Sequence, residues 1–190
     1  MNDLLAADKS RLLDLLRTFS FAKRKVTLAS GRESNFYIDC KRVTLAAEGH
    51  WLVGRLLLDS IFRLDPTVTA VGGLTLGADP IASAVSMASW LGARPLQGFI
   101  VRKEAKGHGT GRFLEGPPLQ AGTRVAIVED VVTTGGSGLK ACERAEEAGL
   151  QVAGVFALVD RLEGGREAFE ARGYRLESLF TRTDFMGDEV

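Results

Sequence analysis

Hydrophobic residues recur along this chain with two spacings, one typical of helices and the other of strands. Near the start, Leu12, Leu15, Leu16 and Phe19 lie at helical spacing, which predicts an amphipathic helix over residues 4–18. Similar patterns predict further helices over residues 46–62, 80–90, 138–148 and 166–171. Short apolar runs predict strands near residues 26–28, 36–39, 68–71, 97–101, 125–128, 152–159 and 174–180.

The order of these elements indicates the fold class. From residue 68 onward strands alternate with helices, which is typical of a parallel sheet with helices on both faces. We therefore expect an α/β fold whose open, mostly parallel twisted sheet is flanked by helices. The two earlier strands flank a turn at residues 30–32, so they predict a hairpin within a small N-terminal hood, about residues 1–45. At 190 residues the chain is expected to form a single domain, 1–190.

Polar or glycine residues follow four of the expected central strands. In an open parallel sheet the ligand crevice lies outside the carboxyl ends of the strands. The four strand ends would therefore bring two acids, several basic groups and glycine loops to one edge. These ends are Gly72-Gly73, Arg102-Lys103, Glu129-Asp130 and Asp160-Arg161.

The segment 125–140 carries the clearest chemical pattern. Four apolar residues lead into Glu129 and Asp130, and a hydroxyl- and glycine-rich loop, residues 133–137, follows before a helical pattern begins. A strand, such a loop and a helix N-terminus form a phosphate site, because backbone N–H groups, hydroxyls and the helix dipole all favour an anion. The two carboxylates would repel that phosphate, so they suit hydroxyl groups or a hydrated metal ion. The segment predicts a sugar phosphate ligand.

Two other phosphate motifs compete with this interpretation. Gly136, Gly138 and Ala141 match the G-x-G-x-x-A spacing of dinucleotide-binding folds, but in those folds the glycines follow the strand directly. Here two carboxylates intervene, where they would repel a pyrophosphate. The chain contains no G-x-x-x-x-G-K-[ST] sequence, which excludes a P-loop.

Residues 102–116 combine five basic or imidazole groups with four glycines and few apolar residues. On composition alone this segment is equally a solvated surface loop. A glycine-rich cationic loop that leaves a strand end is also suited to be a mobile lid, which charge orders over a bound diphosphate. At another strand end, Arg161 stands beside Asp160 after a strongly apolar run. Its guanidinium offers a rigid fork that matches a planar carboxylate.

Composition narrows the range of partners and compartments. Lys plus Arg and Asp plus Glu number 24 each, so the charge balance gives no reason to expect a nucleic acid or a membrane surface as partner. No apolar run approaches the roughly 18–20 residues that span a bilayer. Cys40 and Cys142 form no spacing motif and no secretory leader precedes them. We therefore expect reduced thiols in a cytoplasmic protein.

These motifs together resemble those of the type I phosphoribosyltransferases, which use 5-phosphoribosyl-1-diphosphate (PRPP). The apolar run, Glu-Asp and Thr-Thr-Gly-Gly-Ser look like the PRPP motif of that family. Further segments are similar to its orotate-specific branch, and the resemblance covers roughly residues 10–180. Those segments are T-L-A-S-G-R at 27–32, G-G-L-T-L-G-A-D-P-I-A at 72–82, R-K-E-A-K-G-H-G at 102–109, and Asp160-Arg161.

The resemblance implies an activity and a role for each matching residue. The implied reaction joins orotate and PRPP to give orotidine 5'-monophosphate and diphosphate, with Mg²⁺ held mainly through PRPP and by no protein ligand directly. Lys103 and His108 are the implied catalytic residues, and Thr133 and Arg161 contact orotate. The implied PRPP-binding residues are Arg102, Lys103, Lys106, His108, Glu129, Asp130, Val131, Val132, Thr133, Thr134, Gly135, Gly136 and Ser137.

The family also implies a homodimer in which each lid reaches the neighbouring subunit's site. The chain departs from many relatives at two positions, since Ala29 and Leu76 stand where those relatives have PRPP-contacting lysines. Tyr37 and Ile38 occupy positions that flank orotate in relatives. Two alternatives remain: a phosphoribosyltransferase for a purine or uracil, and a PRPP-binding regulator. The first would not need Arg161, and the second usually adds a nucleic-acid-binding region or a basic face, neither of which this chain has.

Overall fold

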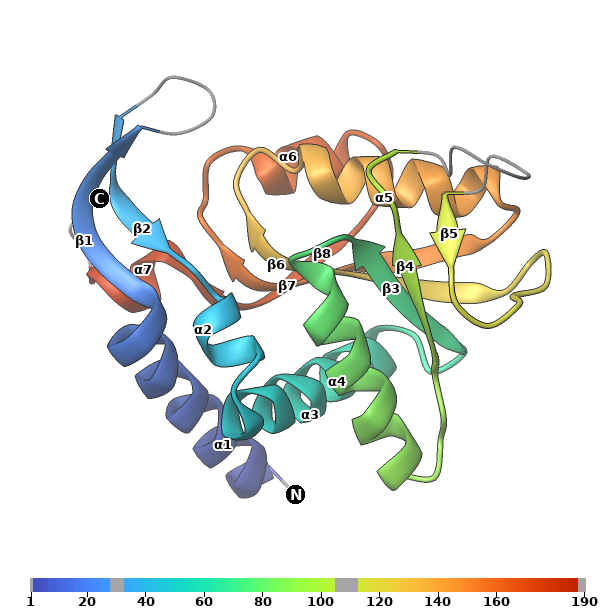
Figure 1. The fold of residues 1–190 in the computed structure, drawn as a ribbon, viewed down its shortest axis with the longest axis horizontal. Helices are drawn as coiled ribbons and strands as arrows, with labels where there is room; N and C mark the ends of the chain where they lie inside the picture. The colour runs from blue at the N-terminus through green and yellow to red at the C-terminus, as the bar shows by residue number, and fades with distance from the viewer. Residues whose placement is uncertain (1, 28–32, 105–112, 188–190) are drawn as a thin grey trace.

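The computed structural model describes residues 2–27, 33–104 and 113–187, with the side chains of residues 2, 24–27, 33 and 34 left out. A six-stranded sheet forms its centre, in the order β5-β4-β3-β6-β7-β8, and every pair is parallel except β4 with β5 (Figure 1). Its strands are β3 (Ala70–Leu74), β4 (Gln97–Val101), β5 (Leu114–Glu115), β6 (Arg124–Val132), β7 (Gln151–Asp160) and β8 (Leu176–Thr181). The expected α/β class is confirmed.

Helices cover both faces of this sheet (Figure 1). Val128 of β6 packs in a core with α3 and α4, whereas the adjacent Ile127 packs in a second core with α5, as the period of two along a strand requires. No helix within the described ranges has the length and apolar character needed to cross a membrane. The helices are α1 (Asn2–Leu15), the π-helical turn η1 (Leu16–Ser20), α2 (Lys41–Thr44), α3 (Ala47–Leu64), α4 (Ala78–Leu91), α5 (Gly136–Glu147), α6 (Gly165–Glu170) and α7 (Arg182–Met186).

The predicted hairpin forms beside the main sheet. Strands β1 (Phe21–Thr27) and β2 (Glu33–Ile38) pair antiparallel. Four aromatic rings, with neighbouring centroids 5.2–6.4 Å apart, join this hairpin to β8 and α7. The rings belong to Phe21, Phe36, Phe180 and Phe185. That residues 1–190 form one domain stays a prediction.

Two predicted strand ends were wrong. Strand β6 continues through Glu129 and Asp130 to Val132, which pairs with Asp160 of β7; Val131 and Val132 are β-branched and favour the extended conformation. Gly73 lies inside β3 and not in a loop. A Cβ there would clash with the Val128 carbonyl oxygen and lie 2.6 Å from the Ala78 Cβ. This glycine therefore allows close packing between β3, β6 and α4.

The segment predicted to be a mobile lid, residues 102–116, begins and ends in the sheet. Leu114 pairs with Val101 in the antiparallel strand β5, and the Arg102 N–H donates to the Phe113 carbonyl over 2.8 Å. Both ends of the segment thus belong to the sheet edge. Residues 105–112, which include the predicted Lys106 and His108, lie outside the described residues.

Candidate active site

The crevice lies where the strand order reverses. The chain passes from β3 to β4 on one side and then to β6 on the other side of β3, and ligands bind at such a switch point in open α/β sheets. The loop after β3 brings Thr75 there, where its hydroxyl donates to an Asp79 carboxylate oxygen over 2.6 Å. The neighbouring apolar Leu76 is exposed in this loop, at a position where the family resemblance implies a lysine.

Residues 133–137, which follow β6 and are predicted to bind a phosphate, are called the phosphate cradle. Gly135 immediately precedes α5 with φ 81°, a left-handed conformation that favours glycine. A Cβ at Gly136 would meet no atom within 4 Å, so the backbone at the helix start is open to an approaching anion. A cavity of about 360 Å³ is lined by Glu129, Val131, Val132, Thr133, Thr134, Gly135, Gly136, Ser137 and Gly138. The structure thus brings the predicted loop residues and Glu129 together around one cavity.

The two carboxylates point in different directions. Glu129 is 5% exposed, its Cγ lies close to Gly138 of α5, and its Oε1 has no hydrogen-bond partner among the described residues. Asp130 lies against Gly77 across the switch point, and its Oδ1 accepts a hydrogen bond from the Val131 N–H over 2.9 Å. The acidic pair therefore borders both loops of the crevice, with Glu129 on the phosphate side.

Burial perturbs both acids in the same direction. Desolvation, reinforced by the charge of Asp130, raises the pKa of Glu129 to about 8. Desolvation also raises the pKa of Asp130, although the Val131 N–H and the Lys41 ammonium favour its ionised form. Strongly perturbed acids in a crevice are typical of functional sites. A buried, unpartnered carboxyl oxygen needs a donor such as a ligand hydroxyl.

The raised pKa of Glu129 predicts how stability depends on pH. The folded protein retains a proton that the unfolded chain releases near pH 4.5, so the free energy of unfolding falls as the pH rises from about 4.5 to about 8. Glu129→Gln is expected to flatten this decline and to stabilise the ligand-free protein at pH 8.5 by a few kcal/mol. Urea denaturation at pH 5.5, 7.0 and 8.5 measures the effect. Parallel pH profiles for the two proteins would contradict it.

Glu129 and Asp130 are candidate ligands for a divalent cation. No group of three or more His, Cys, Asp or Glu side chains gathers within the described part of the chain, so those residues do not form a complete cage. Two adjacent carboxylates with one free oxygen fit an ion that keeps several waters and takes its other ligands from a substrate. The residues present therefore fit a divalent cation that is held mainly by a substrate.

Arg161 lies at the other side of the cradle. It is 7% exposed, its N–H donates to the Val132 carbonyl over 2.9 Å, and its guanidinium forms a 2.8 Å ion pair with Glu163. The guanidinium carbon lies 5.3 Å from the centroid of the Phe36 ring. The structure thus brings the predicted orotate contact Arg161 next to the loop that carries Thr133.

Of the predicted diphosphate contacts, Arg102 and Lys103 lie among the described residues. The Arg102 guanidinium forms a 3.2 Å ion pair with Glu115 on β5. Lys103 is exposed, and its carbonyl accepts a hydrogen bond from the Lys140 ammonium of α5 over 3.0 Å. This bond ties the start of the lid to the helix that carries the phosphate cradle.

Sequence reasoning missed several residues around the site. The ring of Phe36, a hood residue that the sequence did not single out, lies against the Arg161 guanidinium. Glu163 and Arg182 surround the same guanidinium group, although they follow different strands. The sequence signal for Glu163 and Arg182 was that charged residues directly follow β7 and β8. Their meeting is a tertiary contact that one sequence does not reveal.

The fold and the site define the class of protein. An open parallel α/β sheet with an acidic pair and a phosphate loop at its switch point is the arrangement of the type I phosphoribosyltransferases, and the solved structures that match are of this class. No protein-family model matches the chain.

Comparison with known proteins identifies the family. Orotate phosphoribosyltransferase of Sorangium cellulosum is 53% identical over 184 residues, which cover 96% of this chain and 95% of the relative. The Mycobacterium tuberculosis orotate phosphoribosyltransferase, solved with Fe(III) dicitrate, matches with TM-score 0.80 and 42% identity over 94% of this chain and 98% of its own. Its complex with PRPP matches with TM-score 0.76 and 39% identity, over 94% and 99%. The chain belongs to the orotate phosphoribosyltransferase family of glycosyltransferase-type enzymes.

Proposed function

We propose that the chain transfers the 5-phosphoribosyl group from PRPP to orotate, giving orotidine 5'-monophosphate and diphosphate in de novo pyrimidine biosynthesis. One observation carries this proposal. The phosphate cradle, the acidic pair and a buried guanidinium lie at one edge of the sheet, and the Arg161 N–H bonds to Val132 at the entrance of the cradle. The two free, buried cysteines support a reducing compartment, and we place the enzyme in the cytoplasm.

Each part of the site suits one part of the two substrates. The backbone of residues 133–137 would hold the 5-phosphate of PRPP, and Glu129 and Asp130 would accept hydrogen bonds from the ribose hydroxyls. Arg161 would hold the orotate carboxylate, with Thr133 beside the ring. The lid cations Arg102, Lys103, Lys106 and His108 would surround the diphosphate, with His108 as the candidate proton donor.

The chemistry requires no protein nucleophile, because the orotate anion is itself the nucleophile. The residues have three tasks: they align the two substrates, exclude water from the ribose C1 as it gains positive character, and neutralise the departing diphosphate. Magnesium, held mainly through PRPP beside Glu129 and Asp130, adds positive charge at the diphosphate when bound. Lys103 provides the protein's own cation at the same place.

A turnover assay with several bases tests the proposal. Loss of orotate absorbance is followed with PRPP and magnesium, in parallel with uracil, adenine, guanine and hypoxanthine. Consumption of orotate alone, dependent on both PRPP and the metal, is expected. Turnover of a different base would agree with the proposed phosphate site but contradict the assignment of orotate as substrate. PRPP binding without turnover of any base would indicate a regulator.

We further propose that the enzyme is a homodimer and that the lid of each subunit completes the partner's site. Large apolar side chains are exposed on α4: Trp90 by 70%, Leu91 by 64% and Met87 by 58%. Trp90 and Met87 line a groove of about 700 Å³ that β4 and the segment after β5 complete. An exposed apolar groove of this kind is typical of a protein interface. It adjoins the strands from which the lid extends, so a second copy seated there would bring its lid near this crevice.

Disruption of this groove predicts loss of both assembly and activity. Trp90→Asp, made together with Met87→Asp, is expected to convert the dimer to a monomer, because burying two unpaired carboxylates in an apolar interface is strongly unfavourable. Analytical ultracentrifugation measures the mass, and the turnover assay measures activity. Leu4→Asp, a change at an exposed leucine of α1, is the control. A fully active monomer would contradict the shared lid.

A further inference from the structure

Arg182, the first residue of α7, places a second guanidinium beside Arg161. Both guanidinium carbons lie over the same Phe36 ring, at 5.3 Å from its centroid for Arg161 and 5.9 Å for Arg182. The side chain of Arg182 is only 20% exposed. We call the group Phe36, Arg161, Glu163 and Arg182 the base site, because Arg161 is the proposed contact of the orotate carboxylate.

The carboxylate of Glu163 stands between the two guanidinium groups. Its Oε1 lies 2.8 Å from Arg161 Nη2 and 3.9 Å from Arg182 Nη1. The shorter contact is a close ion pair, whereas the longer one exceeds hydrogen-bond range. Glu163 is therefore already paired with the Arg161 guanidinium. An orotate carboxylate has to compete with Glu163 for that guanidinium.

Arg182 retains unused donors that face this group. Its Nη2 donates to the Asn35 side-chain oxygen over 2.8 Å, and its Nη1 makes only the long contact with Glu163. Its Nε is buried and has no hydrogen-bond partner within the described part of the chain. A guanidinium presents its donors as a rigid fork that matches a carboxylate. Arg182 can therefore donate hydrogen bonds to a carboxylate that moves toward it.

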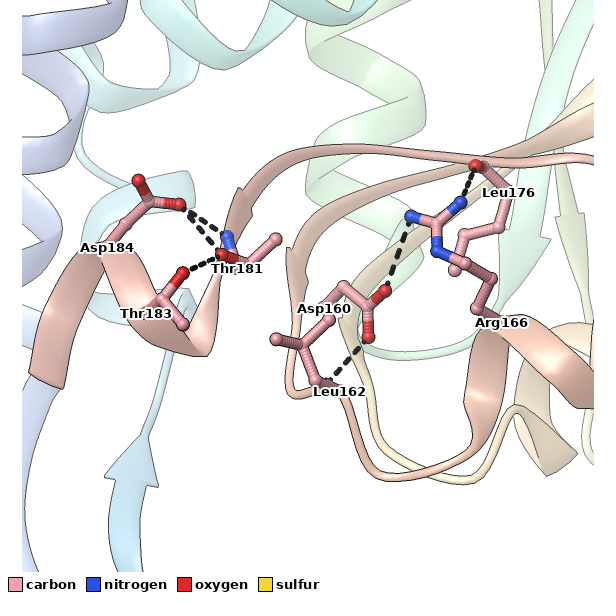
Figure 2. Close-up of polar contacts among 7 residues, drawn as sticks. All are labelled: Asp160, Leu162, Arg166, Leu176, Thr181, Thr183 and Asp184. Carbon is pink, nitrogen blue, oxygen red and sulfur yellow. Dashed lines mark hydrogen bonds and ion pairs between the residues drawn. The ribbon is translucent and has the colours of Figure 1, made fainter. Parts of the chain in front are cut away.

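The two acids nearest to these arginines in the sequence, Asp160 and Asp184, accept hydrogen bonds from other groups (Figure 2). Asp184 accepts hydrogen bonds from the Thr181 N–H and hydroxyl, which cap α7 directly before Arg182. Asp160 accepts a 2.9 Å bond from the Leu162 N–H and a 3.4 Å bond from Arg166. These two acids shape the turns that carry the arginines. Glu163 is the carboxylate that contacts the guanidinium groups of both Arg161 and Arg182.

We infer that Arg182 is a specificity-determining positioning residue, which takes over the Glu163 carboxylate when the orotate carboxylate binds Arg161. Glu163 needs to shift by only about 1 Å to bring its contact with Arg182 Nη1 from 3.9 Å into hydrogen-bond range. Without Arg182, the displaced carboxylate would lose its second cation in a poorly solvated place, which is strongly unfavourable. The exchange therefore favours the binding of a base that carries a carboxylate over the binding of a base that lacks one. This inference rests on the proposed function.

Steady-state kinetics of single and double variants test the exchange. Arg182→Met is expected to raise the KM for orotate on the order of 10- to 100-fold, near the lower end of the effect of truncating one partner of a desolvated charge pair. The KM for PRPP and kcat at saturating orotate are expected to change less than about twofold. Arg182→Lys, which keeps a charge without the fork, is expected to give an intermediate KM for orotate. Arg182→Lys also tests the inference if Arg182→Met folds poorly.

The Glu163→Gln substitution tests whether Arg182 acts through the exchange of the Glu163 carboxylate or only supports the local structure. Removal of the competing charge is expected to lower the KM for orotate in the single variant and to suppress most of the Arg182→Met defect in the double variant. Arg175→Met, at an exposed pair with Glu177 over 2.8 Å, is the matched control. An unchanged KM for orotate in Arg182→Met, or a defect that persists in the double variant, would overturn the inference about Arg182 and leave the proposed function intact. A wild-type protein that does not use orotate would overturn the proposed function, and the exchange with it.

Discussion

Replacement of Lys103 with alanine is expected to lower kcat on the order of 10²- to 10³-fold, as for loss of a group that stabilises charge in a transition state. Lys103 stands exposed at the start of the lid, and Lys140 holds its carbonyl next to the helix of the phosphate cradle. Its ammonium is needed mainly as negative charge develops on the departing diphosphate. An interaction made only in the transition state lowers kcat more than it weakens substrate binding.

Two further measurements make the Lys103 prediction specific. The KM for orotate in Lys103→Ala is expected to stay within about threefold of the wild-type value, since an interaction confined to the transition state contributes little to substrate binding. Arg63→Ala removes an exposed cation on α3, paired with Asp59 over 3.2 Å, and is expected to leave kcat nearly unchanged. Equal losses in kcat and in orotate binding would show that Lys103 acts on the bound substrates and not on the leaving diphosphate.

Replacement of Arg161 with alanine is expected to raise the KM for orotate on the order of 10²- to 10³-fold, because a buried charge partner of the carboxylate is lost. The side chain is nearly inaccessible and lies against Phe36, so water does not replace the guanidinium well. Its backbone bond to Val132 does not depend on the side chain. The phosphate cradle should therefore persist, and PRPP affinity should remain nearly intact.

The affinity for PRPP provides the internal control for Arg161→Ala. PRPP binding, measured by calorimetry, reports whether the cradle has survived the substitution. Arg161→Lys is expected to recover only part of the orotate affinity, because an ammonium lacks the planar fork of a guanidinium. Parallel losses of orotate and PRPP affinity would mean that Arg161 supports the whole crevice and does not select the base.

The loop after β6 could be placed at the sheet edge from the sequence because its determinants are local; that it binds a phosphate stays a prediction. The glycine at position 135 adopts the left-handed conformation that a loop-to-helix junction requires, and the adjacent hydroxyl residues line the same cavity. The alternation of strands and helices was equally readable, since apolar periodicity reports burial directly. The parallel sheet and the loop at its edge followed from these two signals.

The base site and the ends of the strands could not be predicted in the same way. β6 runs past the acidic pair because Val131 pairs with Val159 of β7, a contact with a distant segment. That Phe36 faces Arg161 depends on the register of β2, because a shift of one residue reverses which side chains face inward. Glu163 and Arg182 meet only because β7 and β8 are neighbours in the sheet. Tertiary pairing decides all three features.

Product analysis tests the central claim most directly. The wild-type protein is incubated with orotate, PRPP and magnesium, and the products are separated by chromatography and identified by mass spectrometry. The account predicts orotidine 5'-monophosphate and diphosphate in equal amounts, with neither formed when PRPP or the metal is omitted. Diphosphate without the nucleotide, or no conversion of orotate by a protein that binds PRPP, would contradict it.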